Sequence, residues 1–232
     1  GLASAALVIS EGRPYGTFLA EDYLRDPQGR IVVNPNTGRP RLATEQTYQG
    51  SIQPDWQGGL VNTFRYKGLR MSVVFDTRQG GKIYSRTRGT QRFAGTAPET
   101  LFNDRQPYII PNSVVQVGTS DEYIENTTPL TNANLWEYWG NLPEGTNIID
   151  ASFTKLREVS LSYRLPESLV NRTFFGNIEV GVSGRNLVLW TPDENTYIDP
   201  EVNSFGNGNL QGYEFSSYPS TRSWGANIRV TF

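Results

Sequence analysis

The last twelve residues of the chain alternate between two sets of side chains. One set holds Arg222, Trp224, Ala226, Ile228, Val230 and Phe232, and the residues between them are small or polar. Alternation with a period of two predicts a β-strand with one apolar and one polar face. The pattern continues to the final residue, where soluble domains usually fray. We therefore expect residues 221–232 to form a barrel strand, with its apolar face toward lipid and its polar face toward the lumen.

The same alternation predicts strands at residues 56–66, 69–79, 151–165 and 177–190. A Lys67-Gly68 pair joins the first two, which is typical of a hairpin. The second of them places Leu69, Met71, Val73 and Phe75 on one face, opposite Arg70 and Asp76. The fold class predicted is therefore all-β, an antiparallel transmembrane β-barrel with long loops.

Long and short connections alternate along the chain. The short ones are residues 67–68 and 166–176, and the long ones, rich in Gly, Pro and aromatic residues, are 1–55, 80–150 and 191–219. Outer-membrane barrels have short periplasmic turns and long extracellular loops. We therefore expect extracellular loops at 80–150 and 191–219, and a periplasmic C-terminus. Residues 1–55 are expected to be an extracellular loop region with a small hairpin around residues 30–33.

Composition excludes several classes of function. The 232 residues contain no Cys and no His, which removes disulfides, thiolate chemistry, the Ser-His-Asp triad and imidazole zinc sites. The net charge of −2 argues against nucleic-acid binding. No apolar run approaches the roughly 18 residues of a membrane helix. Because ~5 strands cannot close a barrel and an open sheet edge is unfavourable in lipid, we expect this chain to be a piece of a longer polypeptide.

Several blocks of the sequence resemble the C-terminal end of the SusC/RagA family of TonB-dependent outer-membrane transporters. The resemblance covers the chain from residue 11 to Phe232. It is specific because separate blocks occur in the family's order: PDWQGGLVNTFRYKGLRMSVVFDTRQGG at 54–81, DASFTKLREVSLSYRLP at 150–166, VSGRNLVLWT at 182–191, IDPEVNSFGNGNLQGYE at 198–214 and NIRVTF at 227–232.

This resemblance implies the last ~5 strands of a barrel of about 22 strands. It also implies a bacterial outer-membrane location, of the kind found in Bacteroidetes. The missing N-terminal remainder would carry the plug, the other strands and the TonB contact. The partners implied are a SusD-like surface lipoprotein, outer-membrane lipid, an oligosaccharide or peptide substrate and a second copy of the complex. The expected function is nutrient import without enzyme activity.

Two alternatives stay open. A TonB-dependent siderophore or cobalamin receptor has the same architecture, although it lacks the ordered blocks. A soluble carbohydrate-binding β-sandwich explains the aromatic residues, although it predicts short connections at both ends of the strands. An outer-membrane enzyme is disfavoured, because adjacent acids such as Asp121 and Glu122 point to opposite faces of an extended strand.

The aromatic residues of the long loops are candidates for ligand or partner binding. Aromatic rings stack on sugars and contribute much of the free energy at protein interfaces. Internal packing of a large loop is the alternative interpretation. The candidates are Trp136, Tyr138, Trp139, Tyr197 and Tyr213.

Two further groups of apolar residues have expected roles. Ile228, Val230 and Phe232 resemble the C-terminal signal that the barrel-assembly machinery recognises, and an ordinary lipid-facing strand end is the alternative. Trp190 and Trp224 lie near strand ends beside the long loops. An interfacial aromatic girdle is therefore their expected role.

An acidic cluster follows the strand at 177–190. Calcium requires six to eight oxygen ligands, and the spacing of the cluster differs from that of an EF-hand. We expect no cofactor and no metal, with a structural calcium ion as the alternative; its candidate ligands are Asp193, Glu194, Asp199 and Glu201, with Asn195 and Asn203 nearby. Lumen-facing charges are expected to pair with one another or with a plug: Arg70, Asp76, Glu158, Arg164 and Arg185.

Overall fold

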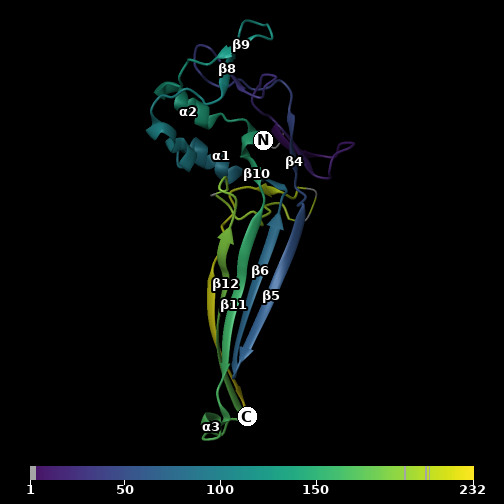
Figure 1. Cartoon of the computed structure of the whole chain (residues 1–232), viewed down its shortest axis with the longest axis vertical. Helices are drawn as coiled ribbons and strands as arrows, with labels where there is room; N and C mark the ends of the chain where they lie inside the picture. The colour runs from purple at the N-terminus through teal and green to yellow at the C-terminus, as the bar shows by residue number, and fades with distance from the viewer. Residues whose placement is uncertain (1–3, 196, 207, 209) are drawn as a thin grey trace. The chain divides into compact units, whose positions relative to one another are not determined.

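The computed structural model describes residues 4–195, 197–206, 208 and 210–232 (Figure 1). The chain divides into two compact units, and each combines segments that are distant in sequence. The strand unit contains Pro54–Gly81, Asp150–Glu201 and Tyr218–Phe232. The loop unit contains Gly1–Gln53, Lys82–Ile149 and Val202–Ser217.

The strand unit is one antiparallel sheet with the strand order β14-β12-β11-β6-β5 (Figure 1). Its strands begin and end within two residues of the bounds expected from alternation: β5 (Trp56–Tyr66), β6 (Leu69–Gln79), β11 (Phe153–Arg164), β12 (Asn177–Trp190) and β14 (Ser223–Thr231). Among the described residues, β5 and β14 each pair with one strand only, so the sheet is not closed. The all-β fold class is confirmed, as a segment of a barrel.

The register gathers apolar side chains on one face of the sheet. One row across all five strands consists of Phe64, Met71, Leu161, Val182 and Ala226. Paired residues point to the same side of a sheet, so this row and its neighbours two residues away form a continuous apolar surface. These side chains are exposed: Phe64 is 56% exposed and Ile228, on the same face, is 72% exposed.

A shift in register separates the two halves of β11. Leu156 pairs with Phe75 of β6, whereas Glu158 pairs with Val74. Adjacent residues of β6 point to opposite faces, so Leu156 and Glu158 also do, although they are two positions apart. Arg157 is therefore the extra residue of a β-bulge. The bulge keeps Leu156 on the apolar face and places Lys155 and Glu158 together on the polar face.

The connections at one end of the sheet are short. Lys67 and Gly68 both have positive φ, 43° and 83°, as a two-residue hairpin turn requires. The short helix α3 (Glu167–Val170) leads from β11 to β12 and lies at the same end of the sheet as the C-terminus (Figure 1). No helix among the described residues is long and apolar enough to cross a membrane.

The loop unit contains more regular structure than the sequence predicted. The segment expected to be an irregular loop at 80–150 forms helices and short strands: β7 (Lys82–Ser85), α1 (Arg86–Phe93), η2 (Pro98–Arg105), β8 (Ser113–Gln116), β9 (Tyr123–Glu125), α2 (Asn132–Gly140), η3 (Glu144–Asn147) and β10 (Ile148–Asp150). Each element is too short to show a clear period in the sequence. Tertiary packing therefore stabilises them.

The N-terminal region also differs from the expected loop. β1 (Ala5–Val8), β2 (Thr17–Ala20) and β4 (Thr47–Ser51) form an antiparallel sheet. Around residues 30–33, antiparallel bridges and backbone hydrogen bonds join β3 (Ile31–Val33) to the segments on either side, and β3 also pairs in parallel with β8. The partner strand lies some 80 residues away in sequence, and local turn chemistry does not indicate such a pairing.

The segment that precedes β14 supplies a buried anchor to the loop unit. β13 (Tyr213–Glu214) pairs in parallel with β7. Tyr213 packs against Phe18 and Tyr84, with ring centroids 5.4 and 5.7 Å away. The buried Glu214 carboxylate accepts hydrogen bonds from Ser85 Oγ and from the Thr87 backbone N–H and Oγ1, at 3.0, 3.1 and 2.7 Å. A carboxylate at a helix N-terminus satisfies free N–H groups and interacts favourably with the helix dipole.

Replacing Glu214 with Ala should loosen α1. Buried donors would lose a charged acceptor, and each such hydrogen bond is worth about 1.5–3 kcal/mol. We expect the hydrogen-exchange protection of α1 amides to fall by about tenfold or more in the full-length protein. The exposed Glu45→Ala variant is the control and should leave the protection unchanged. Equal protection in both variants would contradict the anchoring role.

Candidate functional site

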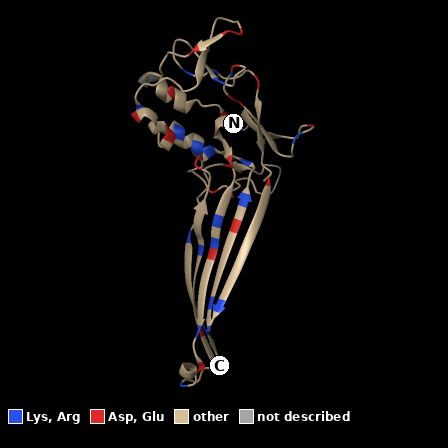
Figure 2. Ribbon diagram, viewed as in Figure 1, with Lys and Arg blue, Asp and Glu red and all other residues tan. Residues whose placement is uncertain are grey.

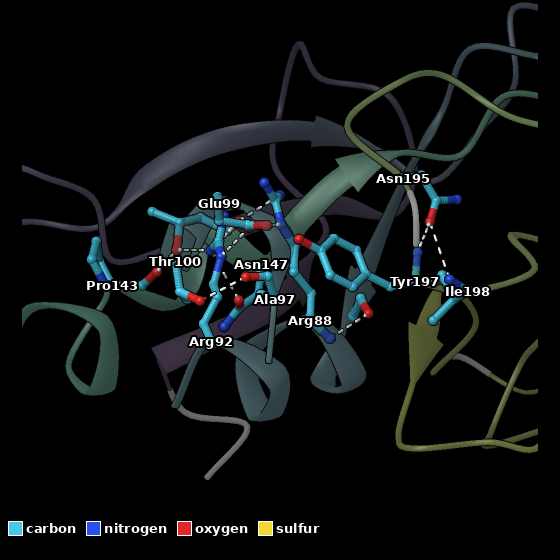
Figure 3. A network of polar contacts seen from close by, with 12 residues as sticks. Arg88, Arg92, Ala97, Glu99, Thr100, Pro143, Asn147, Asn195, Tyr197 and Ile198 are labelled. Atoms are coloured by element: carbon cyan, nitrogen blue, oxygen red, sulfur yellow. Dashed lines mark hydrogen bonds and ion pairs between the residues drawn. The ribbon is translucent and has the colours of Figure 1, made fainter. Parts of the chain in front are cut away.

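Three helical segments of the loop unit are connected by two arginines of α1. Arg88 and Arg92 lie one turn apart, and their Nε atoms donate to the same Glu99 oxygen of η2, at 3.4 and 2.7 Å (Figure 3). Both side chains also donate to the Thr146 carbonyl oxygen of η3, at 2.9 and 3.2 Å. The Arg92 side chain is 7% exposed, so its charge is held by these partners and not by water.

The two faces of α2 have different environments. Leu135 is buried, and Tyr138, three residues on, packs in the same hydrophobic cluster and hydrogen-bonds with Tyr23. Burial and this pairing raise the pKa of the Tyr23 hydroxyl well above its ordinary value. Trp136 and Trp139 lie on the other face, and Trp136 is 64% exposed. Of the three aromatic residues predicted on this helix, Tyr138 therefore packs in the core, and Trp136 and Trp139 face a cavity.

A cavity of about 370 Å³ lies against Trp136 and Trp139, and Leu135 also lines part of its wall. Its size is within the range of small-molecule sites. The ring centroids of Phe93 and Trp136 are 6.3 Å apart, and both side chains are exposed. The lining residues come from α1, η2, α2 and the turn between α1 and η2: Arg92, Phe93, Ala94, Gly95, Thr100, Phe102, Arg105, Leu135, Trp136 and Trp139.

The cavity brings two of the predicted binding residues together and leaves three apart. Trp136 and Trp139 line it, whereas Tyr138 is turned toward the hydrophobic cluster. Tyr213 is 1% exposed, and its hydroxyl donates to the Ala5 carbonyl oxygen at 3.0 Å, so burial places it in the core. Tyr197 belongs to the strand unit and lines a separate cavity there.

Sequence reasoning missed the remaining walls of the cavity. Phe93, Phe102 and Arg105 come from a stretch of turns and short helices without a periodic pattern. Their spacing in sequence gives no sign that they meet Trp136. The aromatic residues of the long loop were the only sign in the sequence of a binding site here.

The polar face of the strand unit carries a partly buried ion network. Lys155 Nζ lies 2.6 Å from both Asp199 Oδ2 and Glu201 Oε2, and the Lys155 and Asp199 side chains are each 4% exposed. Arg157 pairs with Asp76 of β6 and with Glu201. These contacts attach the segment after β12 to the polar face of β11. Figure 2 shows the charged positions of the strands.

The network accounts for two of the four calcium candidates. Asp199 and Glu201 direct their oxygens to Lys155 and Arg157, and Glu194 accepts a hydrogen bond from the Asp150 backbone N–H at 2.7 Å. Within the described part of the chain, no group of three or more acidic residues is arranged to hold a metal ion. Of the other predicted lumen charges, Arg185 pairs with Glu158 at 3.0 Å, and Arg164 donates to Asn177 at 2.8 Å.

The apolar residues predicted at the strand ends lie on the apolar face of the sheet. Trp224 pairs with Gly184 and Trp190 with Thr154, which places both rings on the apolar face, and they are 77% and 50% exposed. Ile228 and Val230 pair with Val180 and Ile178 on the same face. Phe232 contacts Phe174 and Phe175 of the β11–β12 connection, with ring centroids 6.1 and 5.4 Å away.

Comparison with known proteins agrees with this architecture. No family model matches the chain. The chain is 28% identical over its full length to TonB-dependent receptor P26 of Formosa agariphila, and 24% identical over 97% of its length to TonB-dependent receptor P3 of the same organism. It spans about a quarter of the length of these relatives, 24% and 23%. The chain is similar in sequence to one segment of these TonB-dependent receptors.

Solved structures show the same fold. A chain of the RagAB peptide transporter aligns with 99% of this chain at a TM-score of 0.60 and 18% identity, and the aligned part is 25% of the transporter chain. The open-open state of the RagAB peptide importer aligns at the same TM-score with 19% identity, and 24% of that chain is covered. The named relatives are receptors and transporters.

Neighbouring residues of α2 should differ sharply in their effect on stability. Leu135→Ala removes buried apolar volume from the hydrophobic cluster of the loop unit, and such changes cost about 2–5 kcal/mol. Trp136→Ala removes an exposed ring, and we expect about 0.5 kcal/mol. Thermolysin cleavage of the native full-length protein within residues 86–140 should therefore accelerate for Leu135→Ala only. Equal acceleration in both variants would contradict the two-faced description of α2.

The ion network should weaken in acid. Hydrogen bonding from Arg157, with a further contribution from Lys155, lowers the pKa of Glu201 from its ordinary 4.5 to about 2 despite partial burial. Because the folded-state pKa is lower, the stabilisation is complete above the unfolded value and is lost as the pH falls from about 4.5 toward 2. A fluorophore attached through Asp193→Cys should gain mobility over this pH range, measured by anisotropy. With Glu201→Gln, the label should already be more mobile at neutral pH. If the acid-induced rise in mobility kept its full size in this variant, a group other than Glu201 would cause it.

Proposed function

We propose that the chain is the C-terminal part of a SusC-like TonB-dependent importer, which moves oligosaccharides or peptides across the bacterial outer membrane. One combined observation carries the proposal. The whole chain is similar in sequence to TonB-dependent receptors, and its sheet has one continuously apolar face. Such a face suits contact with lipid, and the opposite face carries the ion network and suits a lumen.

The rest of the importer would supply strands that pair with the two edge strands of the sheet, β5 and β14. Backbone N–H and C=O groups at the free edges of β5 and β14 need partners in lipid. An N-terminal remainder of the same polypeptide would supply the other strands, a plug and the TonB contact. A SusD-like surface lipoprotein would cover the extracellular mouth, and two such complexes would form a dimer.

The orientation follows from the connections. The hairpin at Lys67-Gly68 and the α3 connection are short and lie at the end that carries the C-terminus, so we assign this end to the periplasm. Ile228, Val230 and Phe232 would then form the assembly signal. Trp190 and Trp224 would lie at the extracellular interface as part of an aromatic girdle.

The rival functions have less support. A soluble β-sandwich would cover the apolar face with a second sheet, and the described strands of the strand unit form a single sheet. A siderophore or cobalamin receptor would share the barrel. The fold match to RagAB, a peptide transporter, favours nutrient import of the SusC/RagA type.

Uptake by cells tests the proposal directly. Deletion of the gene should abolish growth on the importer's oligosaccharide or peptide, and deletion of TonB should have the same effect although the receptor is still present. A surface lipoprotein should copurify with the receptor from detergent-solubilised outer membranes. Normal uptake in both deletion strains would refute the proposal.

A further inference from the structure

The cavity beside α2 is apolar and carries an unbalanced positive charge. Its lining contains two arginines and, among the described residues, neither Asp nor Glu. Arg92 is neutralised by Glu99, but Arg105 has no carboxylate within ion-pair distance in the described part of the chain. Its only hydrogen bond identified there runs from Nη2 to the Gly95 carbonyl oxygen, at 2.8 Å. The guanidinium therefore keeps donors for a ligand.

The backbone that presents Arg105 adopts an uncommon conformation. Asn103, Asp104 and Arg105 have φ values of 51°, 50° and 60°, so three consecutive residues other than glycine occupy the left-handed region. Such strain concentrates at binding and catalytic sites. Here it occurs where η2 places Phe102 and Arg105 on the wall of one cavity.

Besides Arg105, the lining side chains offer the indole N–H groups of Trp136 and Trp139 as donors, which are too few for the many hydroxyls of a sugar. The Thr100 hydroxyl already donates to the Ala97 carbonyl oxygen at 2.7 Å, and Arg92 donates to Glu99 and Thr146. A hydroxyl-rich sugar would bury polar groups without partners in such a cavity. A ligand with one apolar side chain beside one carboxylate would match the aromatic walls and the guanidinium.

We propose that this cavity binds an acidic peptide, with an aromatic or aliphatic side chain against Trp136 and Phe93 and a carboxylate paired with Arg105. This inference rests on the proposed import function and narrows its substrate to anionic peptides. Arg105 determines specificity through charge, and Trp136 contributes contact area that is independent of charge.

Blocked tetrapeptides separate these two contributions. Acetyl-Gly-Phe-Glu-Gly-amide carries one carboxylate, and acetyl-Gly-Phe-Gln-Gly-amide is its neutral match. Titration calorimetry with the purified full-length receptor should give about tenfold tighter binding of the Glu peptide, since a charge-assisted hydrogen bond is lost with Gln. Arg105→Gln should reduce this preference to less than about twofold, and Arg105→Lys should retain part of it. Trp136→Ala should weaken both peptides equally.

The controls make each outcome decisive. Arg41 is exposed and lies outside the cavity, so Arg41→Gln should keep the full preference. Equal affinity for the two peptides, or a preference that survives Arg105→Gln, would overturn the proposal. Displacement of the Glu peptide by a neutral oligosaccharide would assign the cavity to sugars. Protection of Trp136 from acrylamide quenching by a copurified lipoprotein, with peptide binding lost, would assign it to the partner.

The inference and the importer proposal fail in different experiments. Normal uptake in the deletion strains, with peptide preference intact, would refute the importer proposal alone. TonB-dependent uptake without any preference for the Glu peptide would refute the peptide site alone.

Discussion

Backbone pairing between strands is the constraint on which this structure depends. Every β-strand side chain points to the face that its cross-strand partner also faces, so one register decides the environment of an entire sheet. From Phe64 to Ala226 the register keeps apolar residues together. A slip by one residue would turn Met71 and Leu161 toward the polar face and place charged residues on the apolar face.

The bulge at Arg157 shows how this constraint accommodates a charged site. Strict alternation from Leu161 back along β11 would bring Lys155 to the apolar face. The extra residue reverses the phase, so that Lys155 instead reaches Asp199 and Glu201 on the polar side. The same irregularity therefore preserves the apolar surface and creates the buried attachment for the segment that follows β12.

Sequence predicted the strands well, because a period of two over nine or more residues leaves little ambiguity. The bulge within β11 was harder to predict, because in the sequence Lys155 and Leu156 only interrupt the alternation of apolar and polar residues. The loop unit was largely beyond prediction. Its elements are short, and β3 pairs with β8, while β7 pairs with β13 from a distant segment. In the candidate site, Trp136 and Trp139 could be proposed from residue type alone, whereas Phe102 and Arg105 depend on a backbone conformation that no local motif indicates.

The Glu214 anchor has a consequence for recombination between related chains. Residues 202–217 lie between β12 and β14 in the chain, yet their carboxylate binds Ser85 and Thr87 at the start of α1. A chimera that exchanged residues 82–149 alone would combine Glu214 from one protein with the residues at positions 85 and 87 from another. Functional chimeras should therefore exchange the two segments together, and natural variation in one should be matched by variation in the other.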